Sequence, residues 1–334
     1  MKNKPIASLS LDLDNQWSYM KTHGDTGWES YPSYLDVVVP RVLDFLAERD
    51  LTITFFIVGQ DAALAKNKAA LASLPAAGHE IGNHSFLHEQ WLHLYSEQQI
   101  MDDLAQAEEA ITEVTGQRPI GFRGPGFSCS EAVLSVLAQR GYLYDASTFP
   151  TFIGPLARAY YFMTATLNQE EKEERALLFG TMKDALRPLK PYQWAISPQN
   201  GEQRLLEIPV TTMPIFKIPI HASYILYLSK YSSKLALIYF KAALNLCHLT
   251  GVQVSLLLHP LDFLGSDDVD ELAFFPGMDI LRDKKLAVMS EILRLLTQKF
   301  RVVTMQRHAH ELLKLANQRV VEPNFGAEQL THSK

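Results

Sequence analysis

Short apolar runs alternate with longer amphipathic stretches along most of the chain. The short runs predict strands at Ala7–Asp12, Leu51–Val58, Glu80–Asn83, Gly121–Arg123, Leu143–Asp145, Leu206–Thr211, Val252–Leu258 and Arg301–Thr304. The amphipathic stretches predict helices at Pro40–Glu48, Asp61–Leu74, Glu97–Thr115, Glu131–Arg140, Ser233–Leu249, Asp279–Lys299 and His308–Leu315. Strands that alternate with helices indicate βα units, and about seven or eight such units favour a (β/α) barrel over an open sheet.

Three local features modify this pattern. Pro40 is expected in the first turn of its helix, where its missing N–H breaks no hydrogen bond. Residues 149–205 hold a charged run and several prolines without a clear strand, which predicts an insertion between barrel elements, such as a lid. We therefore expect one barrel domain over residues 1–318, followed by a polar, frayed tail over 319–334.

Composition and charge exclude several classes of protein. The 334 residues are 47% hydrophobic and 20% charged, which is enough apolar material for a large core. The net charge of −6, with Lys and Arg spread along the chain, gives no basic region for nucleic acid. Cys129 and Cys247 are too few for a disulfide framework or a thiolate metal cage. No secretory signal is recognisable at the first residues, so we expect a cytoplasmic protein.

The most apolar segment is Ile218–Cys247, which lysines and tyrosines interrupt. It is too broken for a membrane span, which needs roughly 20 apolar residues. Its composition suits either an ordinary pair of buried helices or a segment that lies in a membrane interface or covers an apolar ligand. The second interpretation predicts peripheral contact with the inner face of the membrane through residues 218–247.

Carboxylates and imidazoles follow two of the predicted strands. Asp12 and Asp14 are two residues apart at the end of the first strand, so they share a face, and a cation would relieve their repulsion. His84 and His88 have the i, i+4 spacing that places two imidazoles on one face of a helical turn to bind one metal. By themselves, the first pair equally fits a solvated loop, and the second fits chance spacing.

Two further polar residues end predicted strands. Arg123 stands between a short apolar strand and the turn Gly124-Pro125-Gly126, from which it can reach carboxylates in a site. His259 ends the apolar run from Val254, where small changes of environment move an imidazole pKa across neutrality. Alone, each also fits a structural role.

Together, these motifs resemble the polysaccharide deacetylase family, which includes chitin, peptidoglycan and nodulation-factor deacetylases. The resemblance covers roughly Ala7 to Val303 and implies a distorted (β/α) barrel of about seven units. It implies that Asp12 is the catalytic base and that Asp14, His84 and His88 bind a divalent metal, with zinc the default. It further implies the following roles for the other motif residues: Arg123 orients Asp12, the Gly126 amide serves the oxyanion, His259 is the general acid, and Asp145 lies at the substrate or supports a strand end.

Two departures from the family pattern bear on the substrate. Leu13 separates the two aspartates, which are usually adjacent, and Gly126 replaces a frequent aromatic residue. Both resemble branches that act on unusual substrates, such as polyprenyl-linked amino sugars, allantoin or cyclic imides. The first expectation is therefore removal of an N-acetyl or N-formyl group from an amino sugar, free or lipid-linked. The alternatives are hydrolysis of a non-sugar amide and a metal-free binding protein. The oligomeric state leaves no signal in the sequence.

Overall fold

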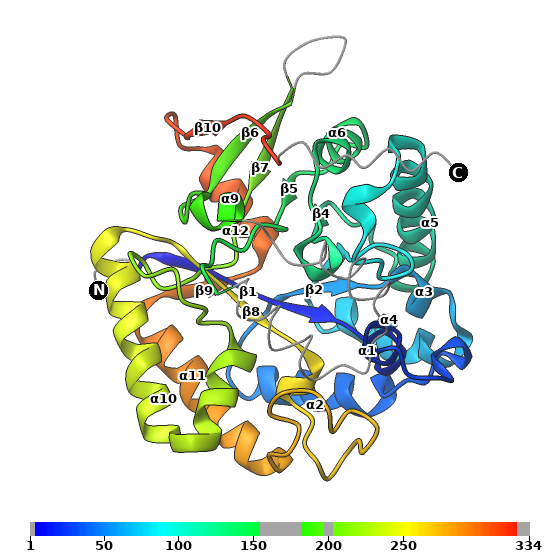
Figure 1. Cartoon of the computed structure of the whole chain (residues 1–334), viewed down its shortest axis with the longest axis vertical. Helices are drawn as coiled ribbons and strands as arrows, with labels where there is room; N and C mark the ends of the chain where they lie inside the picture. Colours follow the sequence, from blue (N-terminus) through cyan, green and yellow to red (C-terminus); the bar gives the residue numbers. More distant parts are fainter. Residues whose placement is uncertain (1–3, 154–181, 197–202, 326–334) are drawn as a thin grey trace.

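A computed structural model describes residues 4–153, 182–196 and 203–325, and it is an α/β fold around one sheet (Figure 1). The sheet has the order β10-β6-β7-β5-β4-β3-β2-β1-β8, and β9 also pairs with β1. All pairs are parallel except β6 with β7. The strands are β1 Ile6–Leu13, β2 Thr54–Ile57, β3 Glu80–Asn83, β4 Gly121–Phe122, β5 Tyr144–Asp145, β6 Tyr192–Ile196, β7 Gln203–Glu207, β8 Val254–Leu258, β9 Arg301–Val303 and β10 Val320–Val321.

The residues that follow β7 bring the two sides of the sheet together. The Val210 N–H donates to the Thr148 carbonyl, beyond β5, at 2.9 Å, and the Thr211 N–H donates to Ser255 in β8 at 3.0 Å. Strands β1, β2, β3, β4, β5, β7 and β8 therefore form a ring, which is the distorted (β/α) barrel expected from the sequence.

Seven of the eight predicted strands are confirmed in place, whereas the one expected over Leu206–Thr211 lies earlier, as β7 Gln203–Glu207, and the insertion is not free of strands. Within the predicted insertion 149–205, β6 forms an antiparallel hairpin with β7. The prediction missed β6 although its residues alternate between buried and half-buried positions, the pattern of a strand with one covered face. The charged run 169–175 lies outside the described residues. The predicted tail is also partly ordered, because β10 pairs with β6.

The helices lie around the sheet, with α10 and α11 on the left in Figure 1 and α5 on the right. Their bounds are α1 Gln16–His23, α2 Leu35–Ala47, α3 Gly59–Ala63, α4 Lys68–Ala76, α5 Glu97–Thr115, α6 Glu131–Gln139, α9 Met182–Leu186, α10 Ala222–Thr250, α11 Arg282–Lys299 and α12 Met305–Leu313. Short 3-10 turns include η3 Leu92–Leu94, η4 Pro125–Phe127 and η6 Pro260–Asp262.

Three predicted helices differ markedly from the structure. The helix expected over Asp61–Leu74 is broken after α3 at Leu64, whose backbone is extended (φ −83°, ψ 122°), and helix resumes only at α4. Helix α2 begins at Leu35, and Pro40 lies inside it rather than in its first turn. Burial of Leu35, Val38 and Val39 extends this helix by more than one turn ahead of the proline. Helix α10 contains a break at Ser232, whose backbone is extended (φ −163°), so the segment Ala222–Thr250 consists of two helical arms.

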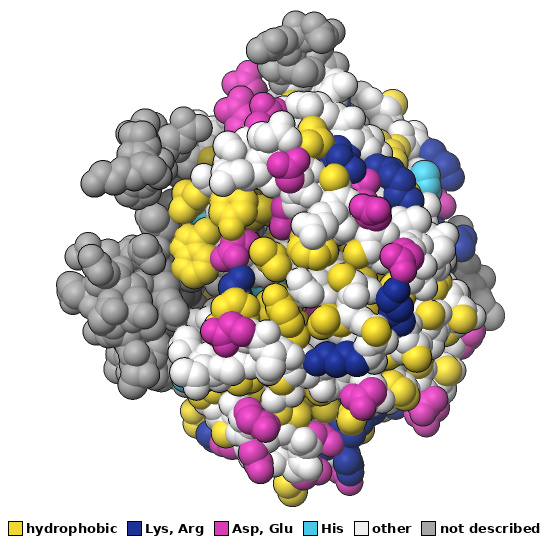
Figure 2. Space-filling view, turned by 90° about the vertical axis from the view of Figure 1, so that its right-hand side faces the viewer, with side chains coloured by type: hydrophobic (Ala, Val, Ile, Leu, Met, Phe, Trp, Pro, Cys, Tyr) yellow, Lys and Arg dark blue, Asp and Glu magenta, His cyan; other side chains and the backbone are white. Residues whose placement is uncertain are grey.

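The largest core cluster fills the space between β1, β2 and β8 and the helices α2, α10 and α11. A second cluster joins α5 and α6 to β6, with Trp194 fully buried. Lys/Arg and Asp/Glu side chains are interspersed over the described residues on the face that Figure 2 shows. Within the part of the chain that the structure describes, every helix is too short or too polar to cross a bilayer.

Candidate functional site

The candidate site lies at the carboxyl ends of the barrel strands. The register pairs Leu11 with Leu258 and, through β2, places the end of β1 level with the end of β3. Asn83 of β3 pairs with Phe122 of β4. Because all these strands are parallel, Asp12, Asp14, His84, Arg123 and His259 emerge at one edge of the barrel.

Asp14 follows β1 directly, and contacts made by its backbone and by Asn15 hold it in place. The Asp14 carbonyl accepts a hydrogen bond from the Tyr34 hydroxyl at 2.6 Å, and the next residue, Asn15, caps helix α1. The Asn15 amide donates to the buried carboxylate of Asp61 at 2.7 Å. These contacts fix the direction in which the chain leaves the strand, and so they fix the Asp14 side chain.

His84 and His88 lie in the loop after β3, and the prediction of a helical turn there is wrong. Ser85 (φ 63°) and His88 (φ 50°) have left-handed backbone conformations, which no right-handed helical turn contains. The Ser85 N–H donates to the Asn83 side chain at 2.9 Å, which starts the turn as soon as the strand ends. The spacing therefore brings the two imidazoles together through a compact loop.

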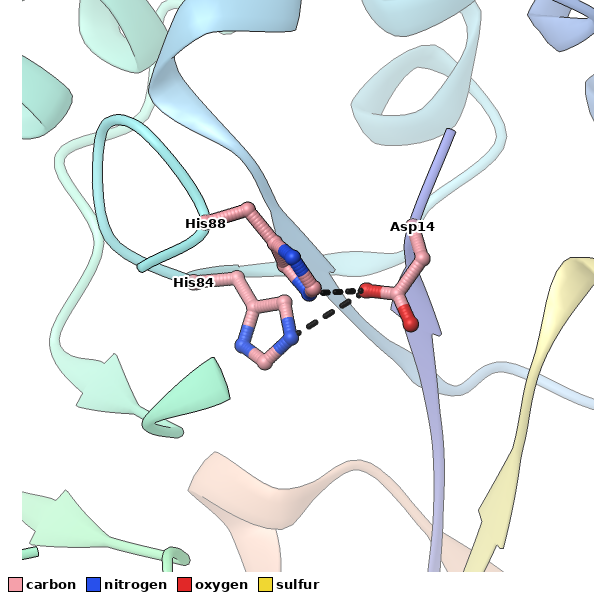
Figure 3. Close-up of side chains that lie close together, drawn as sticks. All are labelled: Asp14, His84 and His88. Atoms are coloured by element: carbon pink, nitrogen blue, oxygen red, sulfur yellow. Dashed lines mark ion pairs between the residues drawn. The ribbon is translucent and has the colours of Figure 1, made fainter. Parts of the chain in front are cut away.

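Asp14, His84 and His88 converge on one point (Figure 3). The Asp14 Oδ1 atom lies 3.2 Å from His84 Nε2 and 3.0 Å from His88 Nε2. One ligand atom from each of the three residues lies within 4.8 Å of the others, and all three residues are buried. In Figure 3 both rings point from the loop toward the carboxylate beyond β1.

The tautomer of His84 is compatible with a cation between these atoms. Its Nδ1 lies 2.6 Å from the Arg123 carbonyl oxygen, which only accepts, so Nδ1 carries the proton. In the neutral ring, Nε2 then directs a lone pair at Asp14, whose Oδ1 is buried without a hydrogen-bond donor. Two imidazole nitrogens and a carboxylate oxygen are a facial ligand set that zinc and related divalent ions accept.

The electrostatics of the three ligands agree with this arrangement. Burial raises the pKa of Asp14, but His88 and His84 outweigh it, and the pKa of this carboxyl lies well below its usual range. Burial lowers the pKa of His84, but the carboxylates of Asp12 and Asp14 outweigh it and raise that pKa. The site thus favours positive charge at its centre.

Asp12 is held by Arg123 beside the three ligands. Arg123 is fully buried, and its Nη1 donates to Asp12 Oδ1 at 2.6 Å and to Ser10 Oγ at 2.9 Å. Its Nε donates to the Ala146 carbonyl at 3.0 Å, and its guanidinium lies 4.4 Å from the Phe56 ring centre. A guanidinium fixed by this many partners can hold one carboxylate oxygen of Asp12, and it thereby sets the orientation of the other oxygen.

The turn that carries Gly126 lies next to the histidine loop. Gly126 (φ 57°) and Phe127 (φ 62°) are both left-handed, and a Cβ on Gly126 would meet the side chain of Gln90 at 3.4 Å. Gly124 has no room for a side chain, since a Cβ there would lie 2.0 Å from the Ser128 carbonyl oxygen. The turn therefore brings backbone close to the candidate site, as an oxyanion donor at Gly126 would require.

His259 follows β8, next to a histidine that the sequence analysis missed. The His259 Nδ1 lies 3.0 Å from Ser223 Oγ. The backbone N–H of His259 donates to the Asp262 carboxylate at 2.8 Å. The ring of His221 lies 6.3 Å from that of His259, and the His221 Nδ1 atom is buried without a partner. Burial and the nearby His259 lower the pKa of His221 to about 3, so this ring is neutral. The position of His221 directly before an apolar helix is the signal in the sequence that could have indicated this residue.

Asp145 contacts other buried groups rather than the three ligands. Its Oδ1 accepts from Ser147 Oγ at 2.5 Å, and its Oδ2 faces the Cys129 thiol at 3.7 Å. Burial raises the pKa of Asp145, and burial together with Asp145 raises that of Glu207 well above its usual range. These two neighbouring acids support the ends of β5 and β7. A role at the substrate remains a prediction.

A tyrosine and a further carboxyl also surround Asp14. The Tyr19 hydroxyl is buried, and burial together with Asp14 raises its pKa well above the usual range. Burial likewise raises the pKa of Asp61 to about 7. No spacing in the sequence indicated either residue, since each comes from a different helix.

Comparison with known proteins relates part of the chain to a family. Residues 25–144, which include His84, His88 and Arg123, match the family model described as polysaccharide deacetylase. This segment of the chain is a polysaccharide deacetylase match. A peptidoglycan deacetylase of Helicobacter pylori is 25% identical to this chain over 154 residues, which are 44% of this chain and 50% of the relative. The chain thus spans about half the length of the curated relatives it matches.

Solved structures give the same fold. A putative polysaccharide deacetylase from Mycobacterium smegmatis superimposes with a TM-score of 0.61 at 22% identity, covering 97% of this chain and 96% of that one. The PuuE allantoinase superimposes with a TM-score of 0.57 at 18% identity, covering 94% and 92%. Asp12, Asp14 and His259 lie outside the residues that the family model matches, so their placement rests on the structure of this chain.

Proposed function

We propose that the chain is a metal-dependent hydrolase that removes an N-acetyl or N-formyl group from an amino sugar. The observation that carries the proposal is the convergence of Asp14, His84 and His88 beside the Asp12–Arg123 pair. The relatives named as peptidoglycan deacetylases support an N-acylated amino sugar as substrate. A lipid carrier on that sugar is a further proposal.

The metal would be held by Asp14, His84 and His88, with zinc as the first candidate. When bound, such an ion supplies a Lewis acid that polarises a carbonyl group and lowers the pKa of water. The tautomer of His84 is already set for this role, because its Nδ1–H donates to the Arg123 carbonyl oxygen.

The chain's own residues would move the protons. Asp12 is the base that accepts the proton of the attacking water, and Arg123 orients its carboxylate through a hydrogen bond of 2.6 Å. The backbone N–H of Gly126 would stabilise the oxyanion of the tetrahedral intermediate, a contribution of about 3–4 kcal/mol for a good donor.

His259 would donate a proton to the leaving amine. Its Nδ1 faces Ser223 Oγ, which leaves Nε2 for the substrate. His221 is neutral and lies 6.3 Å away, so it adds no positive charge that would oppose protonation of His259. The proton balance closes when Asp12 releases to solvent the proton that it took from the attacking water and His259 is reprotonated from solvent after the amine has left.

Metal content and turnover test the proposal together. We expect His84→Ala to lose the metal and all measurable turnover, because one of three ligands is removed. His310→Ala is the matched control, since His310 is exposed on α12 away from the site. Elemental analysis of the purified protein and a chelator-controlled deacylation assay are the measurements. A His84→Ala protein with normal metal content and turnover rules the assignment out.

A panel of substrates tests the reaction class. We expect release of acetate or formate from N-acylated amino sugars, and none from allantoin or cyclic imides. Hydrolysis of only the non-sugar amides would move the chain to the alternative class of substrate. A protein that binds sugar, contains no metal and hydrolyses neither class would be a binding protein.

A further inference from the structure

The second arm of α10, residues 233–250, has an apolar face that no described element covers. Figure 1 shows this arm (yellow) at the left edge of the molecule, outside α11. One side of α10 is buried in the core through residues such as Ala236, Phe240 and Leu244. The opposite side faces away from the protein.

The outward side carries large apolar residues at helical spacing. Leu235 is 65% exposed, Ile238 54% and Leu249 78%, and Tyr231 at the break before this arm is 72% exposed. Leu235, Ile238, Ala242 and Leu249 lie on one side of this arm and form a stripe along the helix; the polar Asn245 lies among them, and Tyr231 stands before the break at Ser232. A row of large exposed apolar side chains on one helix face marks an interaction surface rather than ordinary scattered exposure.

The charge of α10 is opposite to that of the whole chain. Its 29 residues contain no Asp or Glu, and they carry Lys230, Lys234 and Lys241, whereas the chain has a net charge of −6. Lys230 pairs with Asp279 at 2.5 Å. Lys234 and Lys241 are exposed beside the stripe, and the structure gives neither an ion pair within the described ranges. The apolar stripe is therefore flanked by free positive charge.

We infer that the stripe of α10 lies on the surface of an anionic lipid bilayer. An amphipathic helix with apolar residues on one line and lysines beside it inserts its apolar side among the lipid headgroups, while the amines contact lipid phosphates. Each lysine near an anionic surface strengthens binding by about five-fold. Tyr231 suits the same depth, because its ring is apolar and its hydroxyl is polar.

Charge also distinguishes a bilayer from a second copy of the chain. A symmetric dimer through this stripe would place the same face of both copies together. Lys234 and Lys241 of each copy would then meet in one interface without an acidic partner on α10. An anionic surface supplies that missing negative charge.

Vesicle flotation tests the inference on the whole chain. We expect the wild-type chain to float with vesicles made of equal parts phosphatidylcholine and phosphatidylglycerol, to float poorly with phosphatidylcholine alone, and to detach as salt is raised. The double variant K234Q/L235S should partition at least roughly ten-fold more weakly, because it loses one amine and one inserted leucine.

An adjacent Lys–Leu pair elsewhere provides a matched control. Lys314 and Leu315 follow α12, and Leu315 is 57% exposed. The variant K314Q/L315S makes the same chemical changes and should float like the wild type. Circular dichroism and deacylation of a soluble substrate should be unchanged in both variants, which separates this inference from the proposed activity.

Three results would overturn the inference. The first is a wild-type protein that stays at the bottom of the gradient with both kinds of vesicle. The second is equal loss of flotation in the two double variants. The third is a wild-type dimer in solution that K234Q/L235S converts to a monomer, which would show that the stripe binds a second copy.

Discussion

At the residue scale, the candidate site depends on how each charged group is compensated. Arg123 is the central case, because a fully buried guanidinium is stable only with partners on all sides. Its partners are Asp12, Ser10, the Ala146 carbonyl and the Phe56 ring. The sequence predicted the pairing with Asp12, but the sulfur contact with Met305 at 3.5 Å could not be foreseen across 182 residues.

Removing the arginine should therefore destabilise the whole domain. Arg123→Met leaves the Asp12 carboxylate buried and unpaired, and we expect a loss of about 3–5 kcal/mol in the free energy of unfolding. Urea unfolding is the measurement. The double variant with Asp12→Asn should lose less than the sum of the two single losses, since the unpaired charge is then gone. Additive losses would show that the two residues do not interact.

Asp12→Asn by itself separates catalysis from metal binding. The amide side chain of this variant would stay polar beside Arg123 but would not accept a proton at neutral pH. We expect kcat to fall by about 10²–10⁴ while the metal content stays at the wild-type level. Steady-state kinetics with elemental analysis check this expectation. Turnover near the wild-type level would assign the base to another group.

At the element scale, prediction succeeded where the signals were local. Helix α5 was predicted with the same bounds as the structure has, because Ser96 and Gln99 form a capping box and Gly116 ends the helix in a left-handed conformation. The loop of His84 and His88 was mistaken for a helical turn, because the spacing of two residues does not report the backbone angles of Ser85. Helix α2 was predicted too short, because burial of its first turn is a tertiary effect.

A buried imidazole on helix α12 contacts β1, and its pKa should differ between the folded and unfolded states. His308 is fully buried, with its Nδ1 3.0 Å from Ser8 Oγ, and burial lowers its pKa from 6.5 to about 4. The folded state then binds fewer protons than the unfolded state between these two values. This contribution to stability is present above pH 6.5 and is lost as the pH falls toward 4.

A substitution isolates this effect from the other acids of the protein. We expect His308→Gln to be less stable than the wild type at pH 7, and the difference between the two proteins to shrink as the pH falls from 6.5 to 4. Chemical unfolding at several pH values measures it. A stability difference that does not change with pH would contradict the assignment.

At the scale of the whole molecule, the hairpin of β6 and β7 is covered by the segment that follows α12. Val320 and Val321 pair with β6, and the Phe325 ring lies 5.7 Å from that of Trp194. The guanidinium of Arg187 contacts both rings, at 4.9 Å from Trp194 and 4.4 Å from Phe325. Sequence reasoning expected a frayed tail here, because two consecutive valines are too short a run to indicate a strand.

Truncation tests the contribution of this segment. A chain that ends at Gln318 loses β10 and the Phe325 contact, and we expect its melting temperature to fall by roughly 2–8 °C, which corresponds to about 1–2 kcal/mol. A chain that ends at Phe325 keeps both and serves as the control. Differential scanning calorimetry compares the two. Equal melting temperatures would mean that the segment contributes nothing to stability.

The position of β1 has a consequence for how the protein is made. This apolar strand, Ile6–Leu13, is synthesised long before two of its three partners, β8 and β9, which begin only at Val254 and Arg301. Its edge stays unpaired until these distant strands are made, while only β2 is available early. Contacts this distant in sequence slow folding and leave intermediates that aggregate. We therefore expect the yield of native protein in the cell to depend on chaperones that shield the nascent amino-terminal half.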